Sequence, residues 1–187
     1  MNPAGQASIA ALVERNAYYL GQGRELIGSL CDEVFRRPPE PAVEGGDARA
    51  RRGGIGPHLR HIVEHYECFL GGWREGRVDY DRRARDARLE TDRAAALERI
   101  EGLVRGLREL EPRALRVASD CGEGPGQPRT WSESSVEREL VFLASHTVHH
   151  YAVVAVLLRL AGLEPGRDFG VAPSTLRYEQ GDPLCAR

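Results

Sequence analysis

All six histidines of the chain fall into two short clusters, each in a segment whose apolar residues recur with helical spacing. The segments GPHLRHIVEHYECFL and ASHTVHHYAVVAVLLRL hold three each: His58, His61 and His65, then His146, His149 and His150. Imidazole is the commonest metal ligand among side chains, and it titrates near neutral pH. Burying several imidazoles is costly unless each has a binding partner. The two clusters therefore indicate where the protein carries out its chemistry.

The spacing inside each cluster predicts that its imidazoles point into the protein. His146 and His150 are about one helical turn apart, so they share a helix face with Leu143 and Val154. The histidines of the first cluster fall within about 60° of one another on the core face of their own helix. His149 lies at the edge of its apolar stripe. Two facing helices would bring three imidazoles together.

Three converging imidazoles suit a divalent metal. A pair at positions i and i+4 presents two nitrogens to one ion, and a ligand from a second helix completes the site. Water or substrate would take the remaining positions. We expect zinc, nickel, iron or manganese, and three nitrogens alone do not choose among them. The alternative is a metal-free core in which the histidines only hydrogen-bond one another.

Four long helices are predicted to carry and surround these clusters. Thr91 and Asp92 provide an N-cap for the third helix. Ser134 and Glu137 form a capping box for the fourth, which Gly162 ends. The expected fold class is all-α, a four-helix bundle with a long crossover loop after helix 1 and a non-helical C-terminal tail. The helices are expected at about residues 8–35, 56–74, 92–111 and 134–160, and the loop at 38–54.

Two connections between the predicted helices have distinctive compositions. The segment REGRVDYDRRARDARLE is rich in arginine and aspartate, which is typical of solvated surface, with the mouth of a site as the alternative. Residues 115–131 are rich in turn-forming residues and suggest a short irregular hairpin.

Composition narrows the class of protein further. With 187 residues the chain fits a single domain over 1–187, with its bundle core at about 8–162 and its tail at 163–187. A net charge of −2 does not provide the excess of positive charge that is typical of nucleic-acid-binding proteins. The four cysteines lack CxxC spacing, and the longest apolar run, AVVAVLL, is too short to cross a bilayer. We expect a cytoplasmic protein that binds neither nucleic acid nor membrane.

Both histidine motifs resemble those of DinB/YfiT-like proteins. SHTVHHYAVV is similar to the motif on the last bundle helix of that family, and GPHLRHIVEHYECFL to the motif on its second helix. The resemblance implies a four-helix bundle, often dimeric, with one metal ligand on the second helix and two on the fourth. Those ligands would be His61, His146 and His150, with His58 and His65 as alternates to His61.

The same resemblance implies a metal-dependent enzyme that acts on a small molecule, and it does not specify which one. Some relatives are transferases that use a low-molecular-weight thiol, and others are assigned as hydrolases. Glu139 lies on the stripe of His146, two turns earlier, and is the candidate general base or partner of a ligand; a charge near solvent is its alternative interpretation. The alternative function is a non-catalytic metal-binding or structural bundle that acts as a homodimer.

Overall fold

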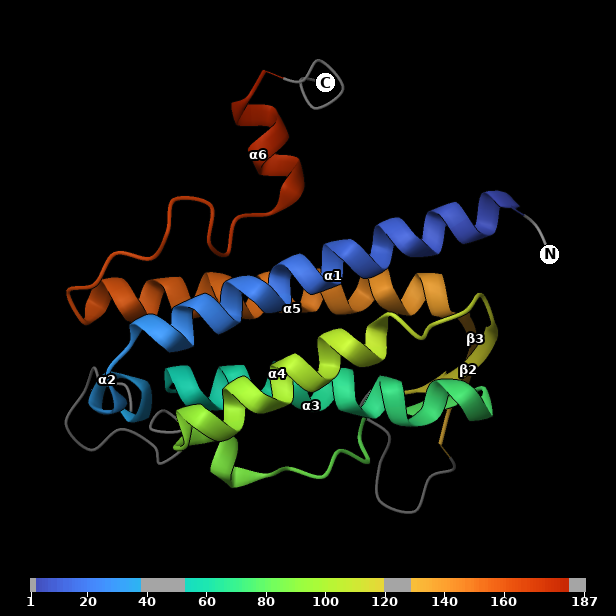
Figure 1. Cartoon of the computed structure of the whole chain (residues 1–187), viewed down its shortest axis with the longest axis horizontal. Coiled ribbons are helices and arrows are strands. Elements are labelled where there is room, and N and C mark those ends of the chain that lie inside the picture. Colours follow the sequence, from blue (N-terminus) through green and yellow to red (C-terminus); the bar gives the residue numbers. More distant parts are fainter. Residues whose placement is uncertain (1–2, 38–52, 120–128, 182–187) are drawn as a thin grey trace.

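The computed structural model describes residues 3–37, 53–119 and 129–181, and side chains from residue 9 onward. Four long helices form its body (Figure 1), namely α1 (Pro3–Ser29), α3 (Ile55–Gly72), α4 (Arg93–Leu107) and α5 (Val136–Leu160). α1 packs against α4 and α5, and α3 also packs against α4 and α5. This arrangement places the two histidine-bearing helices, α3 and α5, side by side.

Local sequence signals set the ends of these helices. Asp92 caps α4, because its side chain accepts a hydrogen bond from the backbone N–H of Ala95 at 3.1 Å. α5 ends where predicted, and Gly162 follows it with φ of 75°, a left-handed conformation that favours glycine. The capping residue of α5 is Ser135 rather than Ser134, since Ser135 receives the N–H of Arg138.

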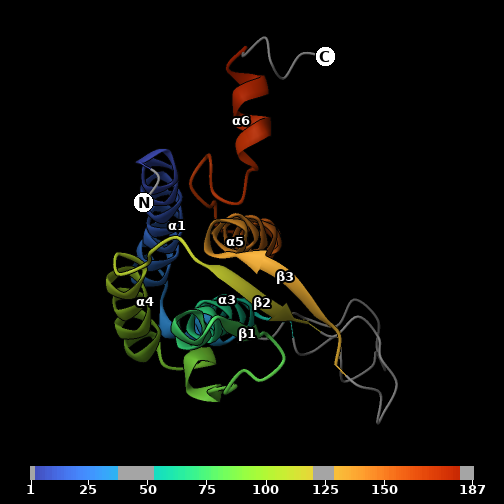
Figure 2. The same ribbon diagram turned by 90° about the vertical axis from the view of Figure 1, so that its right-hand side faces the viewer.

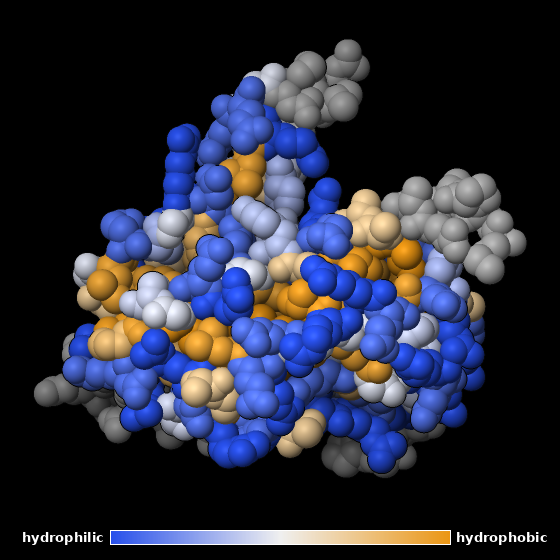
Figure 3. Space-filling model, in the orientation of Figure 1, coloured by the Kyte–Doolittle hydropathy of each residue, from blue (hydrophilic) through white to orange (hydrophobic). Residues whose placement is uncertain are grey.

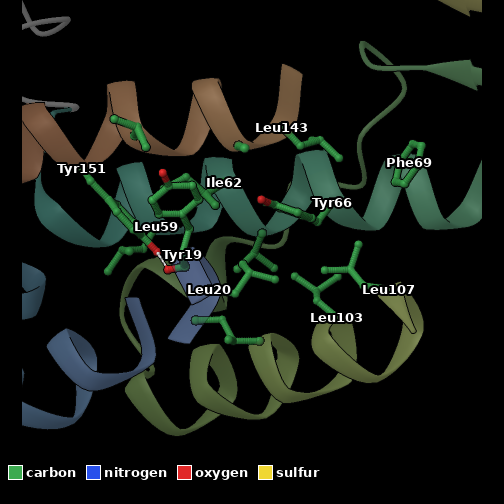
Figure 4. Packing of buried hydrophobic residues seen from close by; sticks show 14 of the residues in the cluster. Tyr19, Leu20, Leu59, Ile62, Tyr66, Phe69, Leu103, Leu107, Leu143 and Tyr151 are labelled. Atoms are coloured by element: carbon green, nitrogen blue, oxygen red, sulfur yellow. Dashed lines mark hydrogen bonds between the residues drawn. The ribbon is translucent and has the colours of Figure 1, made fainter. Parts of the chain in front are cut away.

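The core lies between the four long helices and consists of large apolar side chains. Figure 4 shows aromatic and aliphatic residues from α1, α3, α4 and α5 meeting at its centre. Tyr66 of α3 and Tyr151 of α5 are almost fully buried, and the Tyr151 hydroxyl donates to the carbonyl of Tyr19 on α1 at 2.8 Å. Burial of this apolar area holds α3 and α5 in a fixed relative position.

A small sheet corrects the all-α prediction. Its strands are β1 (Arg77–Asp79), β2 (Ala114–Ala118) and β3 (Trp131–Ser135), in the order β1-β2-β3. β2 and β3 pair antiparallel, as expected for a hairpin across 115–131. β1 pairs parallel to β2, which requires a crossover connection, here made by the 3₁₀ helix η3 (Ala87–Glu90) and α4. The sequence pattern did not predict β1, because three residues carry too little alternation.

Two further elements differ from the prediction. The first predicted helix divides into α1 and the short α2 (Asp32–Arg36), and the 3₁₀ helix η2 (Trp73–Glu75) follows α3. The tail is not wholly irregular: α6 (Pro173–Glu179) forms with Pro173 in its first turn, where proline is favoured. α6 has no buried residue and stands away from the body (Figure 2). The expected crossover loop lies almost entirely outside the described residues.

α5 is longer and more apolar than the prediction about membranes assumed. Among the described residues it is the one helix that could cross a membrane by length and composition. Its buried side chains, however, include Leu143, Tyr151 and Val154, which belong to the shared core. One face of α5 is therefore part of the shared core.

Candidate metal centre

The two histidine clusters meet along the seam between α3 and α5, at one side of the core. The fully buried positions of α5 near the cluster are Leu143, Thr147 and Tyr151, whereas His146 and His150 are only half-buried. The prediction that both imidazoles point into the core therefore holds in part: they lie at its edge rather than at its centre.

Five imidazoles come together at this seam. Ring nitrogens of His61, His65 and His146 lie within 4.8 Å of one another, so one ion can contact all three after small adjustments. The His150 ring centroid lies 4.5 Å from that of His146 and 4.6 Å from that of His61. The predicted ligands His61, His146 and His150 are thus neighbours, and the alternate His65 lies equally close.

The remaining two histidines differ from each other. His58 Nδ1 lies 2.9 Å from His150 Nδ1, so one of these nitrogens donates a proton to the other. His149 is exposed, and its ring reaches only that of His150, at 5.3 Å between centroids. The structure thus joins His58 to the cluster through His150 and leaves His149 at the surface.

One backbone contact fixes the tautomer of His65. Its Nδ1 lies 2.7 Å from the carbonyl oxygen of His61, and a carbonyl only accepts, so Nδ1 carries the proton. Nε2 is then the nitrogen with a free lone pair, directed toward the cluster. A second-sphere bond of this kind usually orients metal-binding histidines. In the structure that lone pair accepts an N–H from Arg83 Nη1 at 3.3 Å.

The cluster keeps its imidazoles neutral. Burial, with a further contribution from the neighbouring His65, lowers the pKa of His61 to about 2. Burial lowers the pKa of His65 and of His146 to about 4. Burial and then His146 lower the pKa of His150 to about 3. All four are therefore deprotonated at neutral pH, the state that a metal requires of its ligands.

One nitrogen tests whether a metal fits here. His146 Nε2 is buried and has no hydrogen-bond partner among the described residues, a condition that costs about 1–3 kcal/mol. His146 also belongs to the group of three imidazoles that lie close enough together for a single ion. A divalent cation would satisfy this nitrogen and use the neutral donors around it, so the residues fit a metal.

Two aromatic rings form a wall beside the cluster. Tyr80 stacks on His65 at 5.6 Å between centroids, and Phe142 stacks on His146 at 5.4 Å. On the other side of this wall lies a cavity of about 260 Å³, which the sheet and the first turns of α5 enclose. Its lining includes the hydroxyl-bearing Ser132. The cavity offers a place for a small molecule next to the histidines.

The candidate base Glu139 lies deep in this region and is fully buried. Its carboxylate accepts hydrogen bonds from Tyr80 at 2.8 Å, from Ser134 at 2.5 Å and from Arg138 at 3.0 Å. The alternative of a solvent-exposed charge at the helix start is therefore wrong. Glu139 reaches the histidines only through the Tyr80 ring, and its role as a base stays a prediction.

Sequence reasoning missed two residues that contact the cluster, Tyr80 and Arg83. Both lie in the arginine- and aspartate-rich segment after β1, which folds back over His65. Part of the segment thus contacts the histidine cluster, whereas Arg82, Arg85 and Arg88 are exposed, and its interpretation as the mouth of a site stays a prediction. The tyrosine within the charge run was the signal that could have indicated contact with the core.

The comparisons with known proteins agree with this geometry. The sequence profile of the DinB family matches residues 27–176. The chain is 34% identical over 104 residues to FK506-binding protein 5 of Rhizopus delemar, covering 54% of this chain and 27% of that protein. The chain thus spans about a quarter of that relative, and no solved structure matches it. Because the profile covers most of the chain, including both histidine clusters, the protein belongs to the DinB family.

Proposed function

We propose that this protein is a metal-dependent enzyme whose divalent ion is held by imidazoles of α3 and α5. The observation that carries the proposal is the buried, unpartnered Nε2 of His146 among neighbouring neutral imidazoles. The ligands would come from His61, His146 and His150, with His65 in place of His150 as the close alternative. When bound, such an ion supplies Lewis acidity and lowers the pKa of a thiol or water.

The protein's own residues define the space around that ion. Tyr80 and Phe142 separate the histidines from the cavity, and their stacking holds His65 and His146 in place. The cavity lined by Ser132 and its neighbours lies behind these two rings, so a substrate held there reaches the ion only if Tyr80 or Phe142 moves. We propose a low-molecular-weight-thiol-dependent transferase or a hydrolase, because an ion held by three imidazoles keeps an open position for a thiol or a water.

Metal content of protein purified without a histidine tag tests this proposal. We expect about one equivalent of zinc, nickel, iron or manganese per chain by elemental analysis. The loaded protein is then assayed with a thiol and an electrophile, and separately with an ester. A folded protein that retains no metal after dialysis would contradict the proposal.

A second candidate, a non-catalytic metal-binding dimer, is favoured by the apolar surface of α1 and α5. Tyr18, Val141 and Val156 are more than half exposed. Figure 3 shows hydrophobic surface along the band occupied by these helices. We propose that this face pairs two copies in a cytoplasmic homodimer of four-helix bundles. Sedimentation of wild type and Val141→Glu tests the dimer, and absence of turnover by the loaded protein would favour this candidate.

A further inference from the structure

Arg83 has no acidic side chain within ion-pair distance among the described residues, although its charge acts from farther away on the buried Glu64. Several other arginines near α3, α4 and α5 do form ion pairs. Arg60 pairs with Glu90 at 2.8 Å, Arg99 with Asp86 at 3.2 Å, and Arg138 with Glu139 at 3.0 Å, whereas no ion pair involves Arg83 among the described residues. Its side chain is half-buried. Arginine is seldom removed from water without a counter-ion, so this charge stands out.

The hydrogen bonds of Arg83 leave part of its guanidinium unsatisfied. Nη1 donates to the carbonyl of Tyr80 and to His65 Nε2, the latter at 3.3 Å. Nε is buried and has no hydrogen-bond partner. A guanidinium has five donors and stays charged at any accessible pH, so it cannot relieve this condition by losing a proton.

A bound metal ion would add positive charge near Arg83, and this favours an anion beside it. The His65 Nε2 lone pair accepts from Arg83, so an ion that took this nitrogen would displace the guanidinium from its acceptor. An ion held by His61, His146 and His150 would instead place a dication close to the fixed charge of Arg83. Either arrangement brings positive charges together beside neutral imidazoles, and an anion between them would relieve the repulsion.

We infer that Arg83 makes this site a receptor for an anionic ligand, with a carboxylate as the chemical class. The planar fork of a guanidinium matches the two oxygens of a carboxylate in parallel hydrogen bonds. The inference deepens the proposed function and rests on it, because it assigns the substrate of the same site a carboxylate group. Arg83 would determine specificity, and Tyr80, whose carbonyl anchors it, would keep the guanidinium beside His65.

Calorimetry with succinate, and with succinamide as its neutral analogue, tests this inference on zinc-loaded and on metal-free protein. We expect succinate to bind and succinamide not to bind. Arg83→Gln should weaken succinate binding at least about 10-fold, since a charge-assisted bidentate contact is lost. Arg83→Lys should fall between the two. The matched control is Arg82→Gln, which removes the same charge from an exposed neighbour and should change binding less than about 2-fold.

Three outcomes would overturn the inference. Succinate binds no better than succinamide, Arg83→Gln binds succinate as wild type does, or Arg82→Gln loses as much as Arg83→Gln. Should Arg83→Gln fail to fold, Arg83→Lys carries the same comparison. Zinc content of each sample is measured in parallel. Protein that takes up no zinc when it is offered, yet binds succinate through Arg83, contradicts the metal function alone, whereas a zinc-loaded sample without succinate binding contradicts only this inference.

Discussion

Two clusters of polar side chains involve α3 and α5. They differ in whether every buried donor and acceptor has a hydrogen-bond partner. In the core, Tyr66 donates to Asn16 at 2.6 Å, Thr147 donates to the carbonyl of Leu143 at 2.7 Å, and Asn16 donates to the carbonyl of Leu140 at 3.0 Å. One turn away, the histidine cluster leaves His146 Nε2 without a partner among the described residues. Complete networks stabilise a fold, whereas incomplete ones mark a place where something else binds.

The largest expected effect comes from removing the unpartnered nitrogen. His146→Ala should weaken binding of zinc by more than about 100-fold, because a ligand is lost and outer-sphere changes alone cost about 10–100-fold. The free energy of unfolding of the metal-free protein should change by less than about 1 kcal/mol, since no hydrogen bond is broken. Competition with a chromophoric chelator measures the affinity, and urea denaturation the stability.

The control for that variant is His149→Ala, which removes an exposed imidazole from the same helix. It should leave zinc affinity within about 2-fold of wild type. Equal losses from both variants would mean that zinc binds at the surface, and the contrast between the two polar groups would then be lost.

The core network should show the opposite behaviour. Asn16→Ala removes the acceptor of Tyr66 and a donor to the carbonyl of Leu140, leaving buried groups unpaired. We expect it to lower the free energy of unfolding by about 2–3 kcal/mol while the folded protein keeps its zinc affinity. Urea denaturation in the presence of a chelator measures this, and Asn16→Asp serves as a variant that keeps an acceptor for Tyr66. An unfolding free energy equal to wild type would show that the network adds nothing to stability.

The two groups also differ in their response to acid. Burial holds the pKa of His61 at about 2 and that of His146 at about 4, below the value near 6.5 of an unfolded imidazole. The unfolded chain therefore binds more protons below about pH 6.5, and the free energy of unfolding falls as pH falls from 6.5 toward 4. We expect metal-free wild type to lose at least about 2 kcal/mol between pH 7 and pH 5.

A variant isolates the contribution of the cluster to that loss. His61→Ala should lose less stability over the same pH interval, because it lacks one of the groups that protonate on unfolding. An identical pH dependence in wild type and His61→Ala would show that His61 contributes nothing to the loss.

Local signals in the sequence predicted the helices well. Asp92 and Gly162 act through contacts within a few residues, so they could be read without the fold. The spacing of the histidines likewise placed both clusters on facing helices. Helix rotation could not be read to better than a fraction of a turn, so the choice of the second-helix ligand among His58, His61 and His65 stayed open.

The contacts of Tyr80 and Arg83, which the sequence did not predict, depend on pairing between distant segments. Tyr80 and Arg83 reach the cluster because β1 pairs with β2, a contact across about forty residues that no local pattern encodes. α6 was missed for a different reason, because its seven residues include too few apolar ones to show a helical period. Composition could suggest that the charged segment lay near a site, whereas only tertiary packing sets Arg83 against His65.

The smallest effect that we expect is that of His58→Ala on zinc binding. It tests whether His58 is a metal ligand or only orients the ring of His150. If His150 donates from Nδ1 to His58 Nδ1, its Nε2 is free for the metal and His58 orients the ring from outside. His58→Ala should then weaken zinc binding about 10-fold, and His58→Gln, whose amide oxygen also accepts, should restore part of the loss. Chelator competition on these variants, with His149→Ala as control, measures both. A loss of zinc affinity as large as that of His146→Ala, without rescue by glutamine, would instead show that His58 is itself a metal ligand.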